Sequence, residues 1–235
     1  MLSLNILLPF LSFAVVFIFA ALVFRRYLER RGLHLAIWGL GLVMYGIGGF
    51  CEFYIGAFGW NALVFRLWYY FGAVLVAAWL GQGTVFLLAR RRWAWATLVV
   101  LALASLFSLY VVFNAPLDSS RFVVGAQLTG RDILPRNVRV LTPFFNVYGT
   151  FTLVGGALYS AWIFWRKRIL LHRLIGNIFI AVGAMSPAVG GTLSRFGLTE
   201  YLYLGEFLGA VLMFVGFLQA TGAEAPRKVS VSEVR

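Results

Sequence analysis

Three ionisable side chains, Glu52, Arg66 and Glu206, stand inside long apolar stretches of this 235-residue sequence. A charge in such a stretch is costly in hydrocarbon, so it normally faces the protein interior, where it pairs with an opposite charge or lines a polar cavity. Each of the three lies near one end of its stretch, and the orientation argued below brings these ends to one side of the membrane. We therefore expect a single cluster in which Arg66 contacts Glu52 or Glu206, directly or through water. The alternative is that the three charges are exposed separately at the membrane interface and form no cluster.

Two interpretations of this cluster differ in function. In the first, Arg66 clamps three helices together and has no further role. In the second, the cluster lines an outward-opening pocket, because two carboxylates that share a site favour a bound proton or a cationic ligand. Asn146 and Tyr70 fall near the same depth and complete this candidate site for a substrate or ion.

A second set of polar residues, Gln82, Thr84 and Gln219, lies deeper, toward the opposite side of the membrane. If the internal repeat described below is real, Gln82 and Gln219 occupy equivalent positions, and we expect them to face one another. Hydrogen bonds between helices would explain these side chains without a function. The alternative is a polar path for a solute through the helix bundle.

The sequence lacks the motifs of the common catalytic and metal sites. It has two histidines, His34 and His172, and a single cysteine, Cys51, with no His-Glu-x-x-His pair and no Gly-x-Ser-x-Gly turn. One cysteine and two histidines cannot form a four-ligand zinc site. We therefore expect no catalytic residue, no metal and no cofactor, and we do not expect an enzyme.

The elements that carry these residues are predicted from composition and hydropathy. The chain is 62% hydrophobic and 12% charged, whereas a soluble domain is about half apolar and about one quarter charged. Seven apolar stretches are each long enough to cross a bilayer. The sequence therefore predicts an all-α integral membrane protein, a single seven-helix domain over residues 1–220 with a short cytoplasmic tail at 221–235. The predicted spans lie near residues 6–24, 33–55, 64–88, 93–113, 140–165, 174–193 and 201–220, with an outer loop at 114–139.

The positions of the basic residues predict the orientation. The net charge of +12 comes from short clusters between apolar stretches, such as 25–31, 90–92 and 166–173. Such clusters mark cytoplasmic loops, so they argue against a nucleic-acid partner. The N-terminus is then outside and the C-terminus cytoplasmic, in a multi-pass protein of the cell membrane.

Two short segments recur at a constant offset and suggest an internal duplication. Residues 72–75 read Gly-Ala-Val-Leu, as do 209–212, and 82–84 resemble 219–221 in the same register. Spans one to three would then be a copy of spans five to seven, with span four as a connector and a parallel pseudo-axis along the membrane normal. The alternative is chance recurrence of small and aliphatic residues.

This three-plus-one-plus-three layout resembles that of the SWEET-type sugar carriers, in architecture alone. Microbial rhodopsins also have seven helices in this orientation. A retinal Schiff base, however, needs a lysine in the seventh span, and the only lysines here are Lys167 and Lys228 in cytoplasmic segments. The resemblance to rhodopsins therefore does not extend to a retinal cofactor.

Three functions fit these features, and we favour a transporter of a small solute or ion. The first alternative is a membrane sensor that binds a small molecule and acts through a separate partner. The second is a non-catalytic accessory subunit of a larger membrane complex. The expected partners are the lipid bilayer, a small-molecule ligand, and either another membrane protein or further copies of this chain.

The orientation generates the first prediction. Lys167 should lie in the cytoplasm and Asp118 outside, because basic clusters are retained on the cytoplasmic side. In intact cells, with Cys51 replaced by alanine, an impermeant thiol reagent should label an Asp118→Cys variant and not a Lys167→Cys variant. Labelling of the second variant alone would overturn the orientation.

Overall fold

The computed structural model describes residues 4–123, 126–168, 170–196, 198 and 201–222, and this part of the chain contains helices and no strand. Seven helical segments are long and apolar enough to cross a membrane, which confirms the predicted all-helical class. The third of them is composite, since α3 continues into the π-helix η1 and then into α4. The seven are α1 (Leu4–Arg30), α2 (Leu33–Phe58), α3–η1–α4 (Ala62–Leu67, Trp68–Leu75, Val76–Leu88), α5 (Arg91–Asn114), α8 (Leu141–Lys167), α9 (Leu171–Arg195) and α10 (Tyr201–Thr221).

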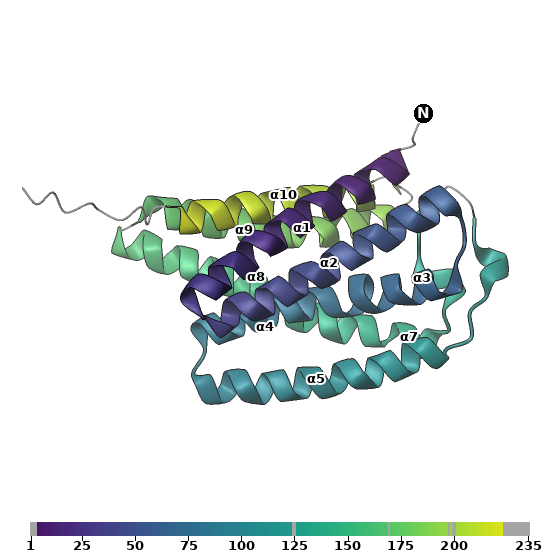
Figure 1. Cartoon of the computed structure of the whole chain (residues 1–235), viewed down its shortest axis with the longest axis horizontal. Helices are drawn as coiled ribbons and strands as arrows, with labels where there is room; N and C mark the ends of the chain where they lie inside the picture. The colour runs from purple at the N-terminus through teal and green to yellow at the C-terminus, as the bar shows by residue number, and fades with distance from the viewer. Residues whose placement is uncertain (1–3, 124–125, 169, 197, 199–200, 223–235) are drawn as a thin grey trace, which may run out of the picture.

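Six of these segments form a closed ring. Around it, α1 packs against α2, α2 against η1 and α4, α4 against α8, α8 against α9, α9 against α10, and α10 against α1. The remaining helix, α5, packs against η1 and α4 from outside the ring and runs along one edge of the molecule in Figure 1. Every ring helix therefore has one face toward a common axis.

Glycine allows the closest of these helix contacts. A Cβ atom built on Gly48 of α2 would lie 2.9 Å from the Cα of Gly72 in η1. A Cβ atom on Gly149 of α8 would lie 2.2 Å from the carbonyl carbon of Ala77 in α4. No side chain fits at such distances, so these helices meet backbone to backbone, as small residues allow in membranes.

The π-helix η1 interrupts a segment that the sequence predicts as one regular helix. Asn61 begins the segment as the N-cap of α3, because its side-chain oxygen accepts hydrogen bonds from the amides of Leu63 (3.0 Å) and Val64 (3.1 Å). Within η1, the amide of Val76 bonds to the carbonyl oxygen of Phe71, five residues earlier. π-Helical turns are rare and concentrate at functional sites.

The predicted outer loop, 114–139, forms a folded cap over its described residues 115–123 and 126–139. Three short helices lie in it: η2 (Ser119–Arg121), α6 (Gly130–Ile133) and α7 (Arg136–Arg139). The cap buries apolar side chains, among them Leu128 and Leu134, against the ring, and the amide of Leu128 donates to the Tyr203 hydroxyl at 2.9 Å. We call this end of the molecule the cap end and the opposite end the arginine-rich end.

The contact of α8 with α4 generates a stability prediction. Gly149→Ala should destabilise the protein by about 1–3 kcal/mol, because the added methyl group meets the α4 backbone. Gly155→Ala is the matched control on the same helix, since a Cβ atom there has nothing within 4 Å, and greater helix propensity should make it neutral or stabilising by up to about 1 kcal/mol. Thermal unfolding in detergent measures both variants, and equal midpoints would contradict this packing.

Candidate functional site

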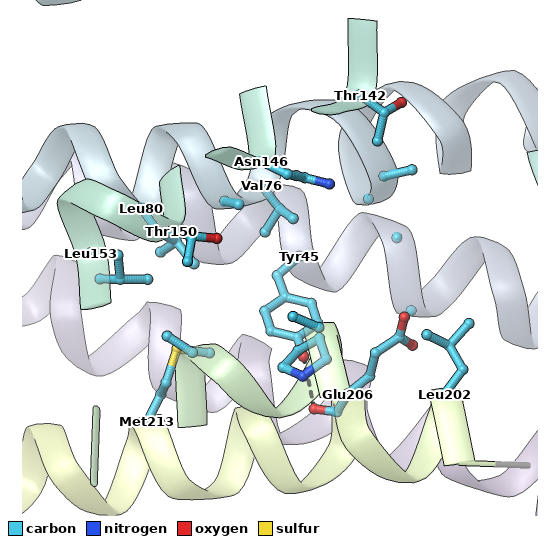
Figure 2. A pocket seen from close by; sticks show the side chains of 18 of the residues that line it. Tyr45, Val76, Leu80, Thr142, Asn146, Thr150, Leu153, Leu202, Glu206 and Met213 are labelled. Atoms are coloured by element: carbon cyan, nitrogen blue, oxygen red, sulfur yellow. Dashed lines mark hydrogen bonds between the residues drawn. The ribbon is translucent and has the colours of Figure 1, made fainter. Parts of the chain in front are cut away.

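The main concave site is a cavity of about 290 Å³ on the ring axis, in the half of the ring nearer the cap. Figure 2 shows it from close by. Side chains from α2, η1, α4, α8, α9 and α10 line it, and many of them are glycine or alanine, which leaves the space open. Its polar lining residues are Tyr45, Glu52, Trp68, Thr142, Asn146, Thr150 and Glu206.

Two carboxyl groups line this cavity, that of Glu52 on α2 and that of Glu206 on α10. Glu206 is half-buried. The indole Nε1 of Trp68 donates to the same Glu52 carboxyl group at 2.7 Å, and Glu52 is only 5% exposed. Two carboxyl groups in one low-dielectric site cannot both ionise without a large cost, as in other carboxylate pairs. The pair therefore favours a shared proton or a bound cation.

Tyrosines fix the position of α10 in this site. The Tyr45 hydroxyl donates to the backbone oxygen of Glu206 at 2.7 Å and so ties α2 to α10 (Figure 2). One turn before Glu206, the Tyr203 hydroxyl accepts the amide of Leu128 and ties α10 to the cap. The carboxyl pair is thus held between the ring and the cap.

Two of these residues, Trp68 and Tyr45, were missed as site residues by the sequence prediction. Helical spacing places Tyr45 on the same face as Glu52, two turns earlier, but the spacing alone gave it no role in the site. Trp68 reaches Glu52 from the start of η1, and neither hydropathy nor spacing indicates a π-helix.

Of the predicted outer candidates, Asn146 joins the carboxyl pair and Tyr70 does not. The Asn146 side chain points into the cavity from α8 (Figure 2). Tyr70 instead points toward α5, where its hydroxyl donates to the backbone oxygen of Ser105 at 3.1 Å. The cavity therefore combines Glu52, Glu206 and Asn146.

The predicted direct pairing of Arg66 with a carboxylate is wrong. Its guanidinium group donates to the backbone oxygens of Val112, at 2.5 Å, and Ala115, at 2.8 Å. These oxygens belong to the C-terminal end of α5, where carbonyl groups lack partners within the helix. Arg66 therefore faces outward from the ring toward α5.

The expected contact of Gln82 with Gln219 is also wrong. Gln82 is fully buried between helices, and its amide donates to the oxygens of Ala94 (2.9 Å) and Thr97 (3.1 Å) and accepts from the Tyr148 hydroxyl (2.5 Å). Gln219 lies exposed on the surface of α10. The third inner candidate behaves like Gln82, because the Thr84 hydroxyl accepts the indole Nε1 of Trp38 at 3.3 Å. Gln82 and Thr84 thus make hydrogen bonds between helices.

Two further cavities continue the axis toward the arginine-rich end. Next to the central cavity is an apolar one of about 20 Å³, and beyond it lies one of about 370 Å³. The central and the apolar cavity share three lining residues, Leu80, Leu153 and Met213. The apolar cavity and the last cavity share two, Trp38 and Ile180. The three are therefore contiguous, with an apolar constriction in the middle. The last cavity is basic, with Arg26, Arg30, His34 and Arg173 among its lining residues.

Comparison of this chain with protein-family models, with curated proteins and with solved structures gives no match. What the chain does must therefore be argued from its geometry. That geometry is of a polytopic membrane protein with seven apolar helices and a row of cavities along the axis of a six-helix ring.

The contacts of Arg66 generate a prediction that separates the two explanations of this charge. Arg66→Met should destabilise the protein by about 1.5–3 kcal/mol, because hydrogen bonds from a charged donor to the end of α5 are lost. The same loss should appear in a Glu52→Gln, Glu206→Gln background, since independent sites add. Thermal unfolding midpoints in detergent provide the measurement. A smaller loss in the double-variant background would restore the ion-pair explanation.

Proposed function

We propose that this chain is a transporter that moves a small solute or ion along the axis of its ring. The observation that carries the proposal is the series of three contiguous cavities with one short apolar constriction. Apolar constrictions close a path to water and ions until the surrounding helices separate. The described arrangement then corresponds to a closed state in which the central cavity is cut off from the arginine-rich end.

The carboxyl pair indicates the charge of the transported species. No arginine or lysine is among the lining residues described for the central cavity. Two carboxyl groups in one cavity favour a bound proton, which a cation that enters between them can replace. A monovalent cation or a protonated amine is therefore the favoured substrate, and Asn146 offers a further polar contact.

The neighbour relations of the helices support the proposed internal repeat. The series α1, α2, α4 and the series α8, α9, α10 each have their middle helix in contact with both others. The two series meet where α1 packs on α10 and where α4 packs on α8. If α1 corresponds to α8 and α4 to α10, these two contacts are equivalent to one another. Such a pseudo-axis runs through the cavities, as in transporters built from parallel repeats. In the proposed orientation, the cap end is outside the cell.

The transport proposal generates an accessibility prediction. In a Cys51→Ala background, an Asn146→Cys variant should react with impermeant thiol reagents from both sides of a vesicle membrane, because a transporter opens its site alternately to each side. Reaction from the arginine-rich side should be the slower, since the constriction must open first. The control is Phe144→Cys, because Phe144 lies on α8 and is 71% exposed on its lipid-facing surface, and it should react from neither side.

The charge of the reagent extends this test to the carboxyl pair. The measured quantity is the rate at which a trimethylammonium thiosulfonate modifies Asn146→Cys, divided by the rate for a sulfonate reagent. This ratio should be about tenfold higher than in a Glu52→Gln, Glu206→Gln background, because a charged cavity concentrates counter-ions. Reaction from the cap side alone, under every condition, would contradict transport and favour a ligand-binding sensor.

A further inference from the structure

A groove of about 840 Å³ lies outside the ring axis, between the cap and α8. Its walls differ strongly in polarity. The cap end of the groove is lined by Thr129, Gly130, Arg131 and Arg139. Along α8, Val147 and Phe151 line its outer, exposed side, and Asn146 and Thr150 line the side shared with the central cavity. The groove is therefore amphipathic.

The polar end of the groove is basic, because Arg131 and Arg139 line it and none of the lining residues described there is a carboxylate. The Nε atom of Arg139 is buried and has no hydrogen-bond partner among the described atoms. Asp118, a carboxylate of the cap, is engaged elsewhere: it accepts the Ser120 hydroxyl at 2.5 Å and the Arg121 Nε at 3.0 Å, and these bonds hold the pKa of Asp118 below its ordinary value. No carboxylate is among the described lining residues. An anionic group fits this end.

The apolar end of the groove faces the lipid. Val147 is 56% exposed and Phe151 is 77% exposed, and both line the groove on α8. At a rise of about 1.5 Å per residue, the distance along the helix from Arg139 to Phe151 is about 18 Å, most of one bilayer leaflet. The positive end lies at the membrane surface, and the apolar end lies toward the membrane centre.

We infer that this groove is a binding site for a membrane phospholipid. Arg131 and Arg139 bind the phosphate group, and one acyl chain lies along Val147 and Phe151. Arginine suits this role because its guanidinium donors match the geometry of phosphate oxygens. A free phosphate ion would leave the apolar half of the groove empty, which is why a lipid is the occupant that fits. Thr142, Asn146 and Thr150 line both this groove and the central cavity, so the lipid lies directly behind one wall of the transport site.

The test is native mass spectrometry of the purified full-length protein in detergent, titrated with phosphatidylglycerol. An Arg131→Gln, Arg139→Gln variant should bind this lipid about tenfold more weakly, because two charge-assisted contacts are lost. Arg136→Gln is the matched control: Arg136 is an exposed arginine of α7 outside the groove lining, and its affinity should change by less than about twofold. If lipid binding weakens equally in both variants, the effect comes from the overall positive charge of the protein, and the proposed site is wrong.

Two further binding measurements identify the molecule that the groove binds. Val147→Trp should weaken lipid binding by filling the apolar half of the groove, whereas Phe144→Trp, on the lipid-facing surface outside the groove lining, should not. Diacylglycerol with the same chains should bind weakly to the wild-type protein, because it lacks the phosphate group. If inorganic phosphate displaces the lipid and Val147→Trp has no effect, the site recognises phosphate alone and the inference fails. Should the double arginine variant not fold, Arg131→Gln alone carries the test, since Arg131 is exposed.

Discussion

Two carboxyl groups buried inside a membrane-embedded ring impose the strictest constraint on this structure. An unpaired carboxylate in such a place costs several kcal/mol, so each oxygen needs a donor. The Trp68 indole donates to Glu52 at 2.7 Å, and Glu206 lines the same cavity. The surrounding contacts serve this arrangement: η1 brings Trp68 to Glu52, Tyr45 ties α2 to α10, and Tyr203 connects α10 to the cap.

The size of the side chains explains where the axis is open and where it is closed. Near the carboxyl pair, Gly48, Gly72 and small residues of α4 and α9 leave room beside backbones that already touch. Farther along the axis, Leu80, Leu153 and Met213 fill the same position and leave a space of about 20 Å³. Because the helices at both levels are held by backbone contacts, opening the constriction requires whole helices to move.

Properties that depend on one residue at a time could be predicted from the sequence. Hydropathy adds along the chain, so the seven apolar helices were found, and Glu52 and Glu206 line one cavity as expected. The direction in which a side chain points depends on its neighbours, and these are set by the packing of distant segments. Arg66 faces α5, and Gln219 faces the molecular surface.

The folded cap and the π-helix could not be predicted from the sequence, for a different reason. The cap has few apolar residues in any regular period, and its short helices exist because Leu128, Leu134 and their neighbours are buried against the ring. The π-helix contains Gly72, which meets Gly48 of α2 backbone to backbone, and no pattern within residues 62–88 indicates that contact.

The position of α5 explains why the chain has an odd number of long helices, seven, around a ring of six. Three crossings are an odd number, so α1, α2 and α3–α4 together begin at the cap end and finish at the arginine-rich end. For α8 to begin at the cap end as well, the chain must cross once more, and α5 makes this crossing without entering the ring. The ring itself does not require that crossing. Two separate polypeptides of three helices each could enclose the same axis, and a single chain needs a seventh helix only because its two halves are covalently joined.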